Sequence, residues 1–302
     1  MVIPIGKALK ALRLKRGLIQ AKLARGIIDR SSLSKIESGR HDVSRATLEL
    51  LADRLGHTAE YVLLYAISNA EFDVFELRDE MDNHTSNMDH AILKKLITKA
   101  ESMPGFKEPL HRQFLLCKKA YTLLDNDPYQ ASLLLQEAIT ITIPGFNERL
   151  IKTFLLARND IEIINSMATL HNKNNNTDRA IELLRLLSDN IRSRTVDPYE
   201  KARSLTLTLY NLSVCLGKQE RYKDGLVVCN EGISEGQAAR CYGLLPKLLY
   251  NKGYCLFKLG HPTMAEECII DAYYTLRAYG LFNDAENIKN NTFRNFNISI
   301  NS

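Results

Sequence analysis

Four segments between residues 131 and 272 repeat one spacing: a small residue, a larger residue four positions later, and a small or apolar residue three positions after that. The spacing i, i+4, i+7 places all three residues on one face of an α-helix. Small residues on that face let a second helix approach closely, so the pattern predicts stacked helix pairs. The four sets are Ala131, Leu135, Ala138; Ala180, Leu184, Leu187; Gly225, Cys229, Gly232; and Ala265, Ile269, Ala272.

A second kind of repetition supports the same fold. The sequence PGFKE at 104–108 recurs as PGFNE at 144–148, and FLL at 114–116 recurs at 154–156, forty residues later in both cases. Internal repeats with periods of about 20–50 residues are typical of solenoids, in which each unit packs on the next. The pattern resembles degenerate tetratricopeptide repeats and predicts an all-α chain that ends in a right-handed α-solenoid. A non-repeating helical bundle is the alternative.

A solenoid of this kind curves, and the first helix of each pair lines a concave groove. Asn165, Asn211 and Asn251 fall at nearly the same place in three successive first helices. Asparagine is a poor helix former, so its position there needs a reason. Either the amide binds the backbone of an extended peptide, because it both donates and accepts hydrogen bonds, or it joins neighbouring helices. The spacing alone leaves both interpretations open.

The net charge of +5 is unevenly distributed along the chain. Residues 1–65 contain twelve Lys or Arg and six Asp or Glu, a balance of +6, whereas the remainder balances at −1. Because 302 residues exceed the usual size of one hydrophobic core, we expect a basic N-terminal domain followed by a nearly neutral body. Concentrated positive charge favours a polyanionic partner such as DNA.

Five short helices are expected within residues 1–65, because glycines and a capping serine mark their boundaries. The second and third helices, joined by a tight turn, form a helix-turn-helix whose third helix is suited to a major groove. The expected helices begin near Ile5, Gln20 and Arg30, after the N-cap Ser44, and near Ala59.

The outward face of the third helix carries small, polar and basic side chains. Arg and Lys donate to guanine and Ser bonds in either sense, so this face suits base edges, although a solvated surface has the same composition. The residues are Arg30, Ser31, Ser32, Ser34 and Lys35.

The stretch LRLKRGLIQAKLARGIIDRSSLSKIESGR at 12–40, followed by TLELLADRLG at 47–56, resembles the Cro/repressor-type helix-turn-helix family along its full length. In that family, the glutamine that opens the second helix and the residues that open the third contact DNA. Ile19 departs from the family, which has a capping Ser or Thr there. The positions that match the DNA contacts are Gln20, Arg30, Ser31, Ser32 and Lys35.

We expect Glu37 to have a structural task rather than a DNA contact, because phosphates repel a carboxylate. A basic residue of the first helix, such as Arg13, is the expected partner.

The complete arrangement resembles the Rgg/PlcR/NprR (RRNPP) quorum-sensing regulators of Gram-positive bacteria. The stretch LLYNKGYCLFKLGHPTMAEECIIDAY at 248–273 is particularly similar to the PlcR branch. The resemblance implies a homodimeric transcription regulator that binds a double-stranded DNA operator and is controlled by a short signalling peptide in its concave groove. It implies that groove asparagines hold the peptide backbone. The matching positions are Asn165, Asn211 and Asn251, with Tyr210, Lys247 and Tyr250 as weaker candidates.

Other classes of protein have little support. The motifs G-x-S-x-G and H-E-x-x-H and the P-loop are absent and the seven histidines are scattered, so we expect no enzyme, no cofactor and no metal site. The six cysteines lie in apolar helical stretches without C-x-x-C pairs, which indicates reduced, buried residues. No apolar run approaches the ~20 residues of a membrane span and no signal-peptide pattern opens the chain. We therefore expect a cytoplasmic protein.

Two alternatives stay open. The repeat domain either docks a protein partner or only dimerises, without a peptide, or it sequesters or modifies another protein. The expected organisation is a helix-turn-helix domain at 1–66, a linker helix and joint at 67–89, and a helical-repeat regulatory and dimerisation domain at 90–302.

Overall fold

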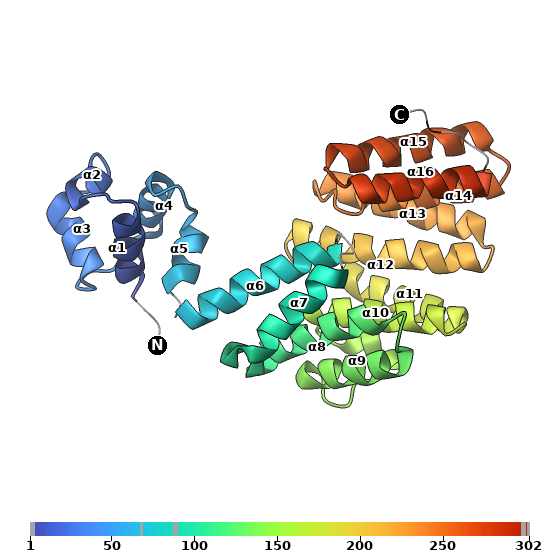
Figure 1. Ribbon diagram of the computed structural model, residues 1–302, viewed down its shortest axis with the longest axis horizontal. Helices are drawn as coiled ribbons and strands as arrows, with labels where there is room; N and C mark the ends of the chain where they lie inside the picture. The colour runs from blue at the N-terminus through green and yellow to red at the C-terminus, as the bar shows by residue number, and fades with distance from the viewer. Residues whose placement is uncertain (1–3, 67–68, 87–89, 297–299, 301–302) are drawn as a thin grey trace. The chain divides into compact units, whose positions relative to one another are not determined.

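The computed structural model describes residues 4–66, 69–86, 90–296 and 300. Every regular element within these ranges is helical (Figure 1), which confirms the all-α prediction. The chain divides into two compact units, of residues 1–84 with 98–106 and of residues 85–97 with 107–302. None of the described helices has both the length and the apolar character needed to cross a bilayer.

The first unit begins with five short helices, and all five start where the sequence predicts. Asp29 and Ser44 cap two of them, since their side chains accept hydrogen bonds from the backbone N–H of Ser32 and Thr47. The helices are α1 (Ile5–Lys15), α2 (Gln20–Ala24), α3 (Arg30–Glu37), α4 (Arg45–Arg54) and α5 (Ala59–Ala66), followed by α6 (Asn69–Ser86). Helix α6 lies within the predicted linker helix and joint at 67–89, and residues 87–89 lie outside the described ranges.

The apolar core of the first five helices takes buried residues from α1, α2, α3, α4 and α5. Leu9 and Leu33 are completely buried in it, so α1 and α3 are held together by apolar contact. The contact is close at Gly6, where a Cβ atom would lie 1.7 Å from the carbonyl oxygen of Ile36. Only glycine fits at this crossing of α1 over α3.

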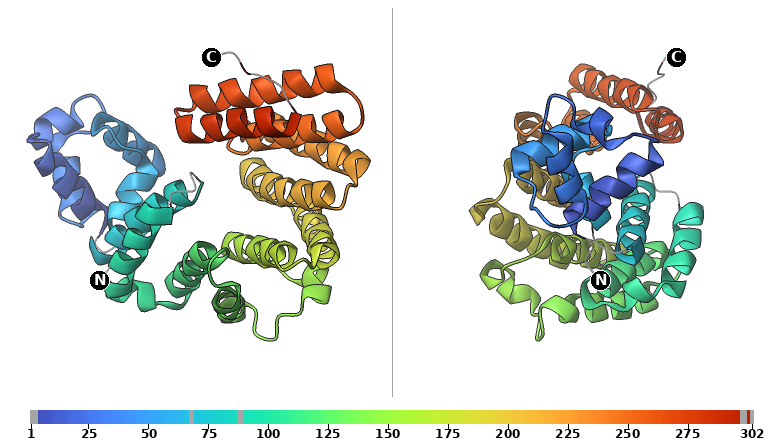
Figure 2. Two further views of the ribbon diagram at one scale, coloured as in Figure 1. Left: turned by 45° about the vertical axis from the view of Figure 1, so that its right-hand side comes forward. Right: turned by 90° about the vertical axis from the view of Figure 1, so that its left-hand side faces the viewer.

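The second unit is a succession of helix pairs, visible in Figures 1 and 2 as antiparallel hairpins in colour order from green to red. Each first helix is followed by a shorter connection and a second helix. The pairs are α8 (Pro109–Leu123) with α9 (Pro128–Thr142), α10 (Arg158–Lys173) with α11 (Thr177–Ser193), α12 (Pro198–Lys218) with α13 (Tyr222–Ala238), and α14 (Leu245–Lys258) with α15 (Pro262–Ala278). The remaining elements are α7 (His90–Ser102), η1 (Pro104–Lys107), η2 (Glu148–Thr153) and α16 (Phe282–Phe296).

The predicted small–large–small spacing accounts for how these pairs pack. All twelve residues of the four sets are buried. The small positions of two first helices, Ser213 and Gly253, are buried as well. A Cβ atom at Gly253 would lie 2.7 Å from Cγ1 of Ile269 in the paired helix. Small residues therefore stand where two helices of a pair touch.

The 3-10 helix η2 follows the second copy of the PGF repeat, and hydrogen bonds from the next helix pair hold it in place. Asn190 of α11 donates from Nδ2 to the carbonyl oxygens of Ile151 and Phe154, each at 2.9 Å. The carbonyl of Ile151 also accepts a hydrogen bond from the backbone N–H of Phe154, so the Asn190 side chain adds a tie between the end of η2 and α11.

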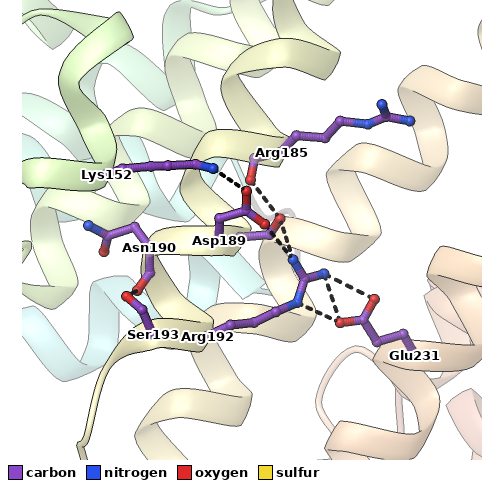
Figure 3. A network of polar contacts seen from close by, with 8 residues as sticks. Lys152, Arg185, Asp189, Asn190, Arg192, Ser193 and Glu231 are labelled. Carbon is purple, nitrogen blue, oxygen red and sulfur yellow. Dashed lines mark hydrogen bonds and ion pairs between the residues drawn. The ribbon is translucent and has the colours of Figure 1, made fainter.

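Ion pairs surround this anchor (Figure 3). Lys152 contacts Asp189 at 2.6 Å, and Arg192 contacts Asp189 at 3.0 Å and Glu231 of α13 at 2.8 Å. All four side chains are about one third to one half exposed. Each pair therefore contributes at most about 1 kcal/mol, but together they join η2, α11 and α13.

Five of the six cysteines are buried, as predicted for small apolar residues, whereas Cys268 is only half-buried. Within the described ranges no group of three or more His, Cys, Asp or Glu side chains is placed to hold a metal ion.

Candidate nucleic-acid interface and repeat groove

The outward face of α3 consists of exposed polar and basic side chains. Arg30, Ser34 and Lys35 are exposed, whereas Leu33 and Ile36 on the opposite face are buried in the core. The helix therefore has one apolar side that fixes its position and one hydrophilic side free to meet a partner.

The N-terminus of α3 is organised by Asp29. Its carboxylate accepts hydrogen bonds from the hydroxyls of Ser31 and Ser32, both at 2.5 Å, and from the backbone N–H of Ser32 at 2.9 Å. These hydrogen bonds, those from the two hydroxyls foremost, hold the pKa of Asp29 well below its usual range. Each serine hydroxyl thus uses its hydrogen atom in the hydrogen bond to Asp29. Its oxygen can still accept a hydrogen bond from another partner.

A buried network joins the second and third helices to α1. Arg13 donates from Nε and Nη2 to the two carboxylate oxygens of Glu37, at 2.6 and 2.8 Å, and from Nη1 to the carbonyl of Leu18 at 2.6 Å. The predicted pairing of Glu37 with Arg13 is confirmed. The hydrogen bond to Glu37 raises the pKa of Arg13.

Gln20, predicted from the resemblance to face DNA, is the third member of this network. It is half-buried, and its Nε2 donates to Oε2 of Glu37 at 2.9 Å. The first residue of α2 is thereby held against the last residue of α3. The sequence did not reveal this contact, because its spacing indicates only that Gln20 opens a helix.

The three asparagines that were predicted to line a groove all take part in hydrogen bonds between first helices. Asn165 is 3% exposed, and its Nδ2 donates to the carbonyl of Ile161 at 2.9 Å and to the hydroxyl of Thr208 in α12 at 3.1 Å. Asn211 donates to Oδ1 of Asn165 at 2.9 Å, so both polar atoms of the Asn165 amide are used within the stack.

Asn251 continues the series one pair further along. Its Nδ2 donates to the hydroxyl of Ser213 at 2.8 Å. Asn211 and Asn251 are half-buried, and no described residue donates to the Oδ1 atom of either. We call Asn165, Asn211 and Asn251 the asparagine ladder. The Oδ1 atoms of Asn211 and Asn251 are therefore its acceptors that no described donor uses.

The weaker sequence candidates lie along the same first helices. Tyr210 and Lys247 are half-buried; burial raises the pKa of Tyr210 and lowers the pKa of Lys247. Tyr250 is also half-buried, and its ring packs edge-on against Phe296 of α16 at a centroid distance of 6.4 Å. Tyr250 is thus partly a packing residue.

Together these features define a class of protein: a helix-turn-helix module with an open hydrophilic face, joined to a stack of helix pairs. The sequence profile of the helix-turn-helix family matches residues 9–62. That of the RNPP family C-terminal domain matches residues 117–286, more than half of the chain. The chain belongs to the RNPP family.

Solved structures of low sequence identity share this fold over nearly the whole chain. PlcR of Bacillus thuringiensis, in complex with the peptide PapR7 and DNA, is similar with a TM-score of 0.66 at 20% identity, covering 94% of this chain and 98% of that chain. Apo PlcR gives a TM-score of 0.59 at 20% identity, with coverage of 95% and 98%. ComR from S. thermophilus, in complex with DNA and its signalling peptide ComS, gives 0.52 at 15% identity, with coverage of 93% and 97%. No curated protein sequence matches the chain.

Proposed function

We propose that this chain is a sequence-specific DNA-binding transcription regulator of quorum sensing, controlled by a short signalling peptide in the groove of its helical repeats. The observation that carries the proposal is the presence in one chain of a helix-turn-helix and an RNPP C-terminal domain. Similar structures with both parts contain DNA and a signalling peptide. The basic balance of residues 1–65 supports the DNA partner.

On the DNA side, Arg30 and Lys35 are the proposed donors to base edges and phosphates. Ser31 and Ser32 would act as acceptors, because their hydroxyl groups already donate hydrogen bonds to Asp29. Gln20 would contribute its carbonyl oxygen or its aliphatic stem, since its Nε2 is bound to Glu37.

The DNA proposal is tested by selecting preferred duplexes from a random library with the full chain and measuring their binding in a gel-shift titration at fixed salt. We expect Arg30→Ala to abolish the preference for the selected duplex over a scrambled one. Arg45→Ala is the matched control, because Arg45 is an exposed arginine outside α3. Unchanged preference in Arg30→Ala would refute the role of Arg30, and no binding of any duplex at low salt would refute the DNA function.

On the ligand side, the proposal assigns the peptide backbone to the asparagine ladder, through Oδ1 of Asn211 and Asn251 above all. Tyr210, Lys247 and Tyr250 are proposed for side-chain or terminus contacts. Asn165 would act mainly by fixing Asn211, since both polar atoms of its amide are bound within the stack.

One observation favours a second candidate function. The amide nitrogens of all three asparagines are used between helices, as a purely structural ladder would require. In that case the repeats bind a protein partner or only dimerise. Asn211→Ala and Asn251→Ala distinguish the two: normal regulation and normal oligomeric state in both variants would favour the second candidate.

The remaining parts of the proposal follow from this function. The protein would act as a homodimer in the cytoplasm and would not be an enzyme. Residues 1–66 would form the DNA-binding domain, 67–89 a linker helix and joint, and 90–302 the regulatory and dimerisation domain.

A further inference from the structure

Asp29 directly precedes α3 and binds both serine hydroxyls of the helix's first turn. Its Oδ1 atom accepts a hydrogen bond from the hydroxyl of Ser31 at 2.5 Å and another from the backbone N–H of Ser32 at 2.9 Å. Its Oδ2 atom accepts a hydrogen bond from the hydroxyl of Ser32 at 2.5 Å. One exposed carboxylate therefore orients both hydroxyl groups.

The direction of these two hydroxyl bonds is fixed, because an ionised carboxylate only accepts hydrogen bonds. The hydrogen bonds from the hydroxyls, that of Ser31 foremost, lower the pKa of Asp29, so the carboxylate is ionised at neutral pH. A serine hydroxyl on a protein surface usually rotates to donate or to accept. Here each hydroxyl hydrogen is already used, and a further partner meets only the lone pairs of the oxygen.

This restriction decides which groups of a DNA duplex the serines can bind. Phosphate oxygens are acceptors, and the charge of Asp29 also repels them. In the major groove, N6 of adenine and N4 of cytosine donate hydrogen bonds, whereas O6 of guanine and O4 of thymine accept them. A hydroxyl that only accepts therefore suits the amino group of adenine or cytosine and not the keto group of guanine or thymine.

We propose that Asp29 is a positioning residue that determines base preference: by holding the hydroxyl of Ser32 as an acceptor, it makes the helix-turn-helix prefer an amino base to a keto base. Ser31 is held in the same sense by the other carboxylate oxygen. The inference rests on the proposed DNA-binding function and adds the class of base to it. Asp29 acts through the serines and needs no contact with DNA of its own.

Asp29→Asn tests the direction of one of these bonds. Asparagine caps helices as well as aspartate does, and its Oδ1 atom can keep the bonds from Ser31 and from the backbone of Ser32. Its Nδ2 group replaces Oδ2 and donates to the hydroxyl oxygen of Ser32, which frees the hydroxyl hydrogen. Ser32 then bonds a base in either sense, so the preference for an amino base should be lost.

The experiment starts from the duplex that the full wild-type chain selects from a random library. Each base pair of this duplex is replaced in turn by the other three, and binding is measured by gel shift at fixed salt. The position at which Ser32→Ala loses discrimination is the base that Ser32 meets. There we expect wild type to prefer an amino base by about tenfold, the factor of one hydrogen bond, and Asp29→Asn to bind amino and keto bases alike.

The matched control is Asp127→Asn, the same change at the aspartate that caps α9, whose Oδ1 accepts from the backbone N–H of Gln130. It removes an equal charge and should keep the tenfold preference. In Asp29→Asn the preference should vanish because the keto duplex binds better relative to the control. If it falls only because the amino duplex binds more weakly, Asp29 has a structural role and the proposal is wrong.

The remaining outcomes separate this inference from the function on which it rests. An amino preference that persists in Asp29→Asn, or a keto preference at this position in wild type, overturns the role of Asp29. So does a selected duplex in which no position depends on Ser32, while selective DNA binding stays intact. Failure of the wild-type chain to select any duplex overturns the proposed DNA-binding function itself.

Discussion

At the scale of single residues, the buried pair of Arg13 and Glu37 determines how the helix-turn-helix is held to α1. Both side chains are less than 10% exposed and joined by two short hydrogen bonds. Removing one partner leaves the other charge buried, which typically costs about 3–5 kcal/mol. The pair is therefore a stronger constraint on α3 than any surface contact.

We expect Glu37→Ala to lower the free energy of opening of α1 and α3 by about 3 kcal/mol or more, because it leaves the buried guanidinium of Arg13 without its charged partner. Amide hydrogen exchange measures this locally, which is necessary in a chain of two units. The control is Glu49→Ala, which breaks an ion pair with exposed Arg45 in the same domain. Equal protection in the two variants would contradict the assignment.

The sequence predicted this pair but not its third member. Charge and position indicated that a carboxylate near DNA needs an internal partner, which identified Arg13. The contact of Gln20 depends on side-chain rotamers across two helices, and spacing carries no information on those. The asparagine ladder shows the same limit: spacing found its three positions, but Thr208 and Ser213 as partners appear only in the structure.

At the scale of helices, local signals were sufficient for the boundaries. Ser44 and Asp29 cap the helices that follow them, and Gly39 and Gly56 adopt positive φ values of 74° and 72° just beyond helix ends. Such signals act within one turn and need no tertiary context. The η2 segment was not predicted, because its conformation depends on Asn190 from a helix about forty residues away.

At Gly6, helix propensity and packing predict opposite effects of a substitution by alanine. Alanine is the better helix former, so propensity alone predicts that Gly6→Ala stabilises α1. The structure predicts the opposite, because the new methyl group would lie 1.7 Å from the carbonyl oxygen of Ile36. We expect a loss of at least about 1–3 kcal/mol, the usual effect of overpacking, seen as faster hydrogen exchange in α1 and α3.

The matched control is Gly243→Ala, where a Cβ atom would meet nothing within 4 Å. It should leave the exchange of α1 and α3 unchanged. If Gly6→Ala protects these helices better than wild type, the close approach of α1 to α3 is wrong.

At the scale of the whole molecule, the division of charge assigns the electrostatics of DNA binding to one part of the chain. Residues 1–65 balance at +6 and the remainder at −1, so the body adds little net attraction for DNA. Phosphate contacts release counterions, and the logarithm of the association constant then falls with the logarithm of salt concentration by about 0.9 per contact. The slope of the logarithm of the association constant against the logarithm of salt concentration therefore gives the number of phosphate contacts made by residues 1–65.

Neutralising one phosphate contact should change this slope, whereas removing the same charge elsewhere should not. We expect Lys35→Ala, on the exposed face of α3, to reduce the steepness of the salt dependence by about 1. Lys223→Ala, at an exposed lysine of α13, changes the net charge equally and should leave the slope at its wild-type value. Fluorescence anisotropy with one labelled duplex across a salt series measures both. If the two variants lower the slope alike, net charge rather than contact by α3 governs binding, and the assignment of Lys35 fails.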